Sequence, residues 1–131
     1  AKTGKTAVTS FDVASRARIA ARAADDKKGD DVLVLDVAEI MGIVECFVIT
    51  SASNTRMVRS IVEEIERQLY DRTGDKPRAV EGLRDASWVL LDYGDIVVHV
   101  FLHETREYYA LERLWADAAT VTWADSATNV S

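Results

Sequence analysis

Apolar residues recur at helical spacing in three segments of the chain. Alanines at every third or fourth position predict a helix over Ser10–Lys28, because alanine is a strong helix former and Gly29 then ends the pattern. A last helix is expected over about Glu104–Asp117. The clearest helix lies between these two, with capping candidates at 51–54 and Gly74 at its end. Its buried face is predicted to carry Met57, Val58, Ile61, Val62, Ile65 and Leu69.

Continuous apolar runs and β-branched segments alternate with these helices. Such runs are typical of strands that are buried on both faces. Strands are predicted over Val32–Leu35, Cys46–Thr50, Arg78–Glu81, Trp88–Tyr93 and Ile96–Leu102. The order of the elements predicts a single α/β domain, with a mixed sheet of about five strands flanked by helices.

The last two predicted strands flank Gly94-Asp95, and a glycine at this position permits a two-residue hairpin turn. The turn sets the register, because side chains alternate between the two faces of a strand. One face is then suited to the core and carries Val89, Leu91, Tyr93, Ile96, Val98 and Val100. The other face mixes aromatic, aliphatic and polar side chains in the pairs Trp88–Phe101, Leu90–His99 and Asp92–Val97.

The sequence leaves two interpretations of this mixed face open. In the first, the last helix covers the face and packs Tyr108 and Trp115 on it. In the second, Trp88 and Phe101 stay partly exposed as a protein-binding patch, since exposed aromatic clusters with a polar rim are typical of protein interfaces.

The length of 131 residues fits one domain. We expect a flexible arm over 1–9, the folded domain over 10–117, and a tail over 118–131 that frays after Thr120. Sixteen basic and 22 acidic residues give a net charge of −6. This charge argues against binding to naked nucleic acid, because basic surfaces supply most of the affinity for phosphates.

Cys46 is the single cysteine, so the chain forms no internal disulfide. Its place in an apolar strand favours a buried structural thiol over a nucleophile. No apolar run reaches the ~20 residues of a membrane span, and the first ten residues lack the apolar core of a signal peptide. We therefore expect a cytoplasmic location and no membrane contact.

Motifs for cofactors and metals are missing from the sequence. It contains neither the glycine-rich dinucleotide motif nor the phosphate-binding P-loop. His99 and His103 would lie about 13 Å apart along a strand, too far to share a metal ion. We predict no metal and no cofactor.

Two polar clusters have ordinary structural explanations. Ser51, Ser53 and Asn54 fit helix capping better than anion binding. Asp92 and Asp95 fit turn chemistry better than a site for a divalent ion. We therefore predict no catalytic residue in either cluster.

Four segments, taken in order, resemble the ribosomal silencing factors, the Iojap-related family. They are Cys46–Val58, Glu81-Gly82, Trp88–Phe101 and Arg106–Trp115. The resemblance extends from about Phe11 to Trp115, and the joint match in order makes it specific.

The resemblance implies a compact α/β domain similar to nucleotidyltransferases, commonly a homodimer when free. It also implies binding to the fourteenth protein of the large ribosomal subunit at the subunit interface. Occupying that face blocks joining of the small subunit and represses translation under nutrient limitation. The matched positions expected to contact the partner are Trp88, Leu90, Leu91, Asp92, Tyr93, Asp95, His99 and Phe101.

The register and the charges refine this expected contact surface. Leu91 and Tyr93 point to the core side in the register above, so Tyr93 would reach the partner only from the hairpin tip. The carboxylates expected to meet lysines and arginines of the partner are Asp92, Asp95, Glu104 and Glu107.

The likeness to nucleotidyltransferases raises a nucleotide-acting enzyme as the alternative function. Such enzymes place Gly-Ser at the helix start and two carboxylates one residue apart on the next strand. Here the helix start reads Ser51-Ala52-Ser53, and no Asp-x-Asp follows. Asp92 and Asp95 are two residues apart at a turn, which does not suit a two-metal site. We expect no catalysis.

Overall fold

The computed structural model describes residues 12–124, so the predicted arm over 1–9 and the last seven residues of the predicted tail lie outside it. The elements of the described part are α2 (Val13–Asp26), β1 (Asp30–Asp36), α3 (Ala38–Met41), β2 (Cys46–Ala52), α4 (Thr55–Thr73), β3 (Ala79–Glu81), β4 (Trp88–Asp92), β5 (Ile96–Leu102), α5 (His103–Tyr109), α6 (Leu111–Leu114) and β6 (Ala119–Thr120). No helix in this part is long and apolar enough to cross a membrane.

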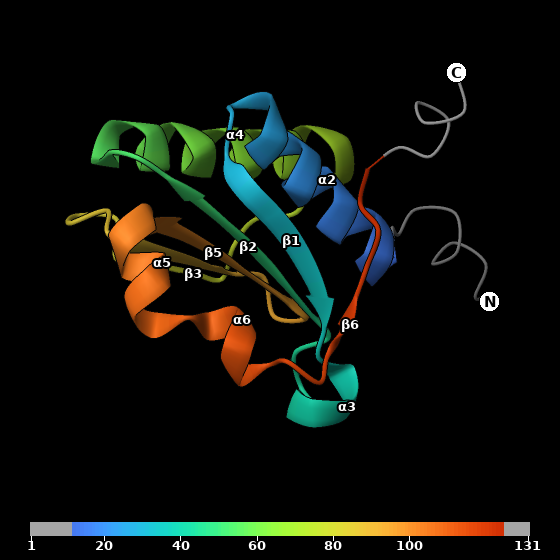
Figure 1. Ribbon diagram of the computed structural model, residues 1–131. Helices are drawn as coiled ribbons and strands as arrows, with labels where there is room; N and C mark the ends of the chain where they lie inside the picture. The colour runs from blue at the N-terminus through green and yellow to red at the C-terminus, as the bar shows by residue number, and fades with distance from the viewer. Residues whose placement is uncertain (1–11, 125–131) are drawn as a thin grey trace, which may run out of the picture.

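The strands form one mixed sheet in the order β3-β4-β5-β2-β1-β6. β2 and β5 run parallel at its centre, and the other neighbouring strands are antiparallel. Helices α2 and α4 cover one face of the sheet, and α5 and α6 lie on the other (Figure 1). The predicted α/β architecture is therefore confirmed, with six strands in place of about five.

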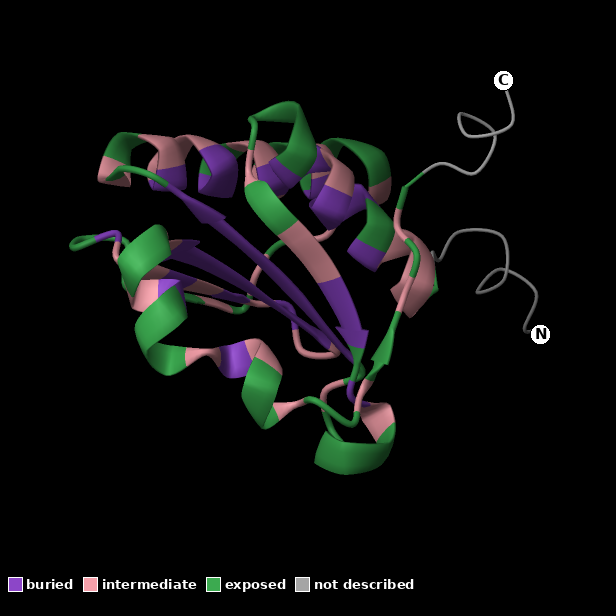
Figure 2. Cartoon of the chain, viewed as in Figure 1, coloured by how far each residue is buried: buried purple, intermediate pink, exposed green. Residues whose placement is uncertain are grey.

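The larger core lies between the sheet and the layer of α2 and α4. Asn54 caps α4 by accepting a hydrogen bond from the Met57 amide at 2.8 Å, which confirms the expected capping role. Of the predicted apolar face of this helix, Met57 is only partly buried. Burial is concentrated on the strands and on the helix faces turned toward them (Figure 2). The fully buried residues of the face are Val58, Ile61, Val62, Ile65 and Leu69.

The hairpin of β4 and β5 has the predicted register. Trp88 lies opposite Phe101, Leu90 opposite His99 and Asp92 opposite Val97. The Tyr93 amide donates to the Ile96 carbonyl oxygen at 2.9 Å and closes the pairing next to the turn. Gly94 turns the chain with φ of +93°, a conformation that glycine adopts without steric cost.

A second, smaller core fills the space between the sheet and the layer of α5 and α6. It is built from Leu35, Val37, Phe47, Ile49, Val97, Phe101 and Leu111. The mixed face of the hairpin contributes Val97 and Phe101 to this core. The centre of the mixed face is therefore covered by α5 and α6.

The structure differs from the sequence predictions after residue 103. The single helix expected over Glu104–Asp117 is divided at Ala110, which has φ of +46° and ends α5. The chain then pairs with β1 through β6, and the Val121 amide donates to the Val34 carbonyl oxygen at 2.8 Å. The Trp123 indole donates to the Val32 carbonyl oxygen at 3.1 Å, so the chain follows β1 beyond Thr120 where fraying was expected.

A glycine-specific contact supports the start of β4. Gly82 has φ of +84°, and a Cβ atom added there would overlap the backbone carbonyl oxygen of Trp88. Gly42 has φ of +83° as well, but a Cβ atom there would meet nothing within 4 Å. Alanine substitutions at the two glycines therefore distinguish the cost of steric overlap from the cost of backbone strain.

We expect Gly82→Ala to lower the free energy of unfolding by about 2 kcal/mol, because it adds overlap to backbone strain. Gly42→Ala is the matched control and should cost about 1 kcal/mol or less, from strain alone. Urea unfolding followed by tryptophan fluorescence measures both changes. Equal losses in the two variants would contradict the role assigned to the Gly82 contact.

Candidate functional site

An array of ring contacts connects the hairpin to α5. The Trp88 ring lies 4.8 Å from the Tyr109 ring and 4.9 Å from the Phe101 ring, measured between centroids. The Trp88 indole Nε1 donates a hydrogen bond to Nδ1 of His99 at 3.1 Å. Tyr108 extends the array to the surface, with its ring 5.0 Å from that of Tyr109.

The outer part of this array is exposed. Tyr108 is 80% exposed and Tyr109 49%, whereas Trp88 and Leu90 on β4 are partly buried. We call Trp88, Leu90, Tyr108 and Tyr109 the aromatic patch. α5 and α6 cover the centre of the mixed face, where Phe101 is fully buried, whereas Trp88 stays partly exposed at its outer border. That this border binds a protein stays a prediction.

The helices α5 and α6 cover the mixed face of the hairpin with Tyr109 and Trp115, whereas the sequence predicted Tyr108 and Trp115. Tyr109 packs on Trp88, whereas Tyr108 is 80% exposed. The helix ends at Ala110, so Tyr108 does not share one helical face with Leu111 and Trp115 as the sequence predicted. Trp115 does pack in the layer, with its ring 5.6 Å from that of Phe47. The sequence did not indicate Tyr109 as a residue of the patch. A helix without a break over 104–117 would place Tyr108, and not Tyr109, at helical spacing with Trp115.

Four residues expected to contact a partner are buried in this structure. Leu91 and Tyr93 face α2 and α4, on the opposite side of the sheet from Trp88. His99 and Phe101 share the face of Trp88 but lie beneath it, with His99 only 4% exposed. The surface offered to a partner by the expected set is therefore limited to Trp88, Leu90, Asp92 and Asp95.

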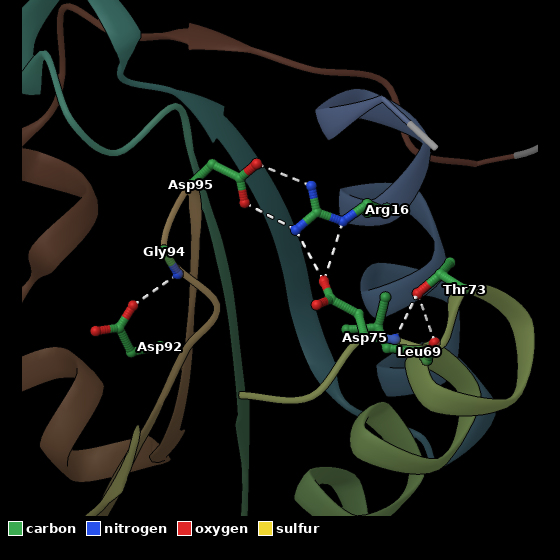
Figure 3. A network of polar contacts seen from close by, with 7 residues as sticks. All are labelled: Arg16, Leu69, Thr73, Asp75, Asp92, Gly94 and Asp95. Carbon is green, nitrogen blue, oxygen red and sulfur yellow. Dashed lines mark hydrogen bonds and ion pairs between the residues drawn. The ribbon is translucent and has the colours of Figure 1, made fainter. Parts of the chain in front are cut away.

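Asp95 already has a partner within the molecule. The Arg16 guanidinium donates to both carboxylate oxygens of Asp95, at 2.8 and 2.9 Å, and to Asp75 at 2.9 and 3.2 Å (Figure 3). Its hydrogen bonds hold the pKa of Asp95 below the usual range. Asp95 therefore ties the hairpin to α2 and shares the positive charge of Arg16 with Asp75.

Asp92 has the expected role at the turn. Its carboxylate accepts a hydrogen bond from the Gly94 amide at 2.8 Å (Figure 3). The Arg78 guanidinium lies 3.5 Å from the same carboxylate. Asp95 is turned instead toward Arg16, so the two carboxylates do not converge. Within residues 12–124, no group of three or more histidine, cysteine or acidic side chains is arranged to hold a metal ion.

Exposed carboxylates lie close to the aromatic patch. Glu81 is exposed on β3 directly opposite Leu90. Glu104 is exposed one helical turn before Tyr108, a spacing that places both on one side of α5. The rim of the patch is thus acidic, although Glu81 replaces Asp95 as one of its contributors.

A buried arginine fixes the orientation of α5. Arg106 is 8% exposed, and its Nη1 donates to Ser51 Oγ at 3.1 Å and to the Asp30 carbonyl oxygen at 3.2 Å. Its Nε donates to Glu112 at 3.1 Å and so connects α5 to α6. Ser51, an anion-binding candidate in the sequence, thus serves to anchor this helix beside a surface hollow of about 420 Å³.

Cys46 is buried at the start of β2, as expected for a structural thiol. Burial is the main reason that the pKa of its thiol is raised to about 11. A thiol with this pKa is almost entirely protonated at neutral pH, so it is a poor nucleophile.

An α/β domain with an exposed aromatic patch and an acidic rim has a surface whose composition is typical of protein interfaces. The chain belongs to the family described as ribosomal silencing factor during starvation, whose model matches residues 10–131. This confirms the resemblance seen in the sequence. Members of the family are silencing factors and not enzymes, so the nucleotide-acting enzyme is excluded.

Individual relatives agree with this assignment. The chain is 44% identical over 101 residues to the ribosomal silencing factor of Bacillus subtilis, which covers 77% of this chain and 85% of that protein. A crystal structure of a protein from Chromobacterium violaceum matches with a TM-score of 0.77 and 28% identity, covering 81% of this chain and 88% of that one. The mouse protein named for mitochondrial assembly of the ribosomal large subunit is 35% identical over 88 residues, 65% of this chain and 38% of its own length.

Proposed function

We propose that this chain silences ribosomes by binding the large subunit through its fourteenth protein, at the face that meets the small subunit. Occupation of this face blocks subunit joining by steric exclusion and represses translation under nutrient limitation. The observation that carries the proposal is the aromatic patch at the border between β4 and α5. The name of the mouse relative, which refers to the ribosomal large subunit, supports the same target.

The aromatic patch has the composition of a binding hot spot. Tryptophan and tyrosine dominate the energetics of protein interfaces, because they bury a large area while few rotamers are fixed. Tyr108 and Tyr109 are exposed by 80% and 49%, so binding a partner would remove much aromatic surface from water. Trp88 lies beside them with one side supported by Phe101. This support limits how far the ring can move before the partner arrives.

The charge of the chain suits a basic protein partner. The net charge is −6, and Glu81 and Glu104 lie at the rim of the patch. Charges of opposite sign speed the encounter, whereas the buried aromatic contacts determine how long the complex lasts. The chain thus reaches a ribonucleoprotein particle through a protein on its surface and not through its RNA. We further propose a cytoplasmic location and a homodimer when the chain is free.

Co-sedimentation with purified large subunits tests the proposal. We expect the chain to pellet with large subunits, to prevent their joining to small subunits, and to release as salt is raised because opposite charges are screened. Added free ribosomal RNA should not compete. Pelleting that is unchanged between low and high salt, or displacement by free RNA, would contradict the proposed docking on a basic protein. Light scattering of the free chain tests the homodimer separately.

A further inference from the structure

We propose that His99 is the positioning residue of the aromatic patch, because its buried ring accepts the Trp88 indole N–H and holds Trp88 in the orientation that the partner meets. This inference rests on the proposed function, since it concerns the surface that binds the large subunit. It assigns His99 a role through Trp88, in place of the direct contact expected from the sequence.

The hydrogen bond determines the protonation of the imidazole. Nδ1 of His99 accepts from Trp88 Nε1 at 3.1 Å, so Nδ1 carries no proton and the neutral ring carries its proton on Nε2. Nε2 is buried and has no hydrogen-bond partner in residues 12–124. A hydrocarbon side chain would fill this layer without an unpaired N–H group. What histidine adds at this position is therefore the acceptor for Trp88.

The imidazole itself is well supported. The Phe47 ring meets it edge-on at 4.8 Å, and the Phe101 ring lies nearly parallel to it at 6.1 Å. β5 lies between two strands of the sheet, where it pairs with β2 and β4 along its length. An acceptor held in this way has one position. It therefore imposes one orientation on the donor.

Trp88 needs such a restraint because its other contacts are not directional. Its ring is tilted by 33° against Phe101 and by 48° against Tyr109, and contacts of this kind tolerate rotation of the indole. A hydrogen bond weakens steeply as its angle departs from linear, so it fixes the rotation that ring packing leaves open. Fixing the ring before association removes part of the ordering cost of binding.

The bond also defines what Trp88 presents to the partner. Its one polar atom is engaged inside the protein, so the indole offers ring carbons and no hydrogen-bond donor. Such a surface suits the aliphatic stems and cationic heads of lysine and arginine, which pack on indole faces. The partner chemistry inferred at Trp88 is thus a basic side chain laid across the ring.

The first test is made on the free protein by NMR. Imidazole ¹⁵N shifts should show Nε2 protonated and Nδ1 unprotonated, and the Trp88 indole proton should exchange slowly with solvent. Trp88→Phe assigns this resonance among the three indoles. His99→Leu should speed the indole exchange by at least about tenfold, whereas His99→Asn, which keeps an acceptor, should restore most of the protection. Fast exchange in the wild type would overturn the inference.

The second test is binding to purified large subunits. We expect His99→Leu to weaken binding about fivefold while it stays folded, and His99→Asn to recover binding to within about twofold. In a Trp88→Phe background, which lacks the indole N–H, His99→Leu should have no further effect on affinity. If the two losses of affinity add in the variant that carries both Trp88→Phe and His99→Leu, the positioning role is overturned, because His99 would then act on binding independently of the Trp88 N–H group.

A failure of the proposed function can be distinguished from a failure of the role given to His99. If Trp88→Ala pellets with large subunits as the wild type does, the aromatic patch is not the docking surface. If Trp88→Ala binds weakly while folded His99→Leu binds as the wild type, the patch stands and only the role of His99 is rejected.

Discussion

Trp88→Ala should weaken binding to the large ribosomal subunit by at least about 2 kcal/mol, or about 30-fold in Kd. Trp88 occupies the middle of the aromatic patch, between Tyr109 on α5 and Phe101 beneath it. Its removal takes away the largest ring of the surface and the support of its neighbour. Co-sedimentation over a range of subunit concentrations measures the change.

A matched control is available on the other side of the molecule. Tyr70 on α4 is 52% exposed, close to the 49% of Tyr109, and its ring is approached by Lys76, which lies outside the patch. Tyr70→Ala should bind as the wild type does. Tyr109→Ala should weaken binding in the same direction as Trp88→Ala. Equal affinities for folded Trp88→Ala and Tyr70→Ala would reject the patch as the docking surface.

The stability of the protein should fall by about 3 kcal/mol as the pH is lowered from about 6.5 to about 4. Burial lowers the pKa of His99 from its ordinary value of 6.5 to about 4 in the folded protein, because the charged imidazolium loses its hydration there. Between these values the unfolded chain binds a proton and the folded chain does not. Lowering the pH therefore favours unfolding, and the full stability is present above the ordinary pKa.

Urea unfolding between pH 7.5 and pH 4.5 measures this dependence. Carboxylates of lowered pKa such as Asp95 lose their stabilising contribution only below their ordinary range near 4, so the upper part of the interval reports mainly on His99. His99→Leu should flatten the dependence, and His103→Gln should leave most of it. A curve that stays unchanged in His99→Leu would show that burial of this imidazole is not its cause.

Much of the fold could be predicted because its patterns are local. The turn at Gly94-Asp95 and the alternation of residues on either side of it give the register of β4 and β5, including the pair Trp88–Phe101. The apolar face of α4 is also visible in its spacing. By contrast, β6 has two residues and α3 has four, lengths too short to give a periodic signal.

The site was predicted less well, because long-range contacts decide it. The pairing of Asp95 with Arg16 joins residues 79 positions apart in the sequence. The residues next to Asp95 in the sequence do not show whether its carboxylate pairs within the chain or is free to bind a lysine of a partner. The end of α5 at Ala110 likewise breaks the helical spacing that joined Tyr108 to Leu111 and Trp115, and Tyr109 is the tyrosine that packs on Trp88. Alanine gives no sign that a helix will stop there, since it is a strong helix former.

The two outermost strands of the sheet have a consequence for self-association. β3 has three residues and β6 has two, so each outermost strand is itself too short to pair over a long stretch with a second chain. Continuous intermolecular sheets and strand addition need longer free edges. A pair of these chains would therefore be held together by side-chain surfaces. It should separate and re-form without unfolding, and its edges should resist the backbone pairing that starts aggregation.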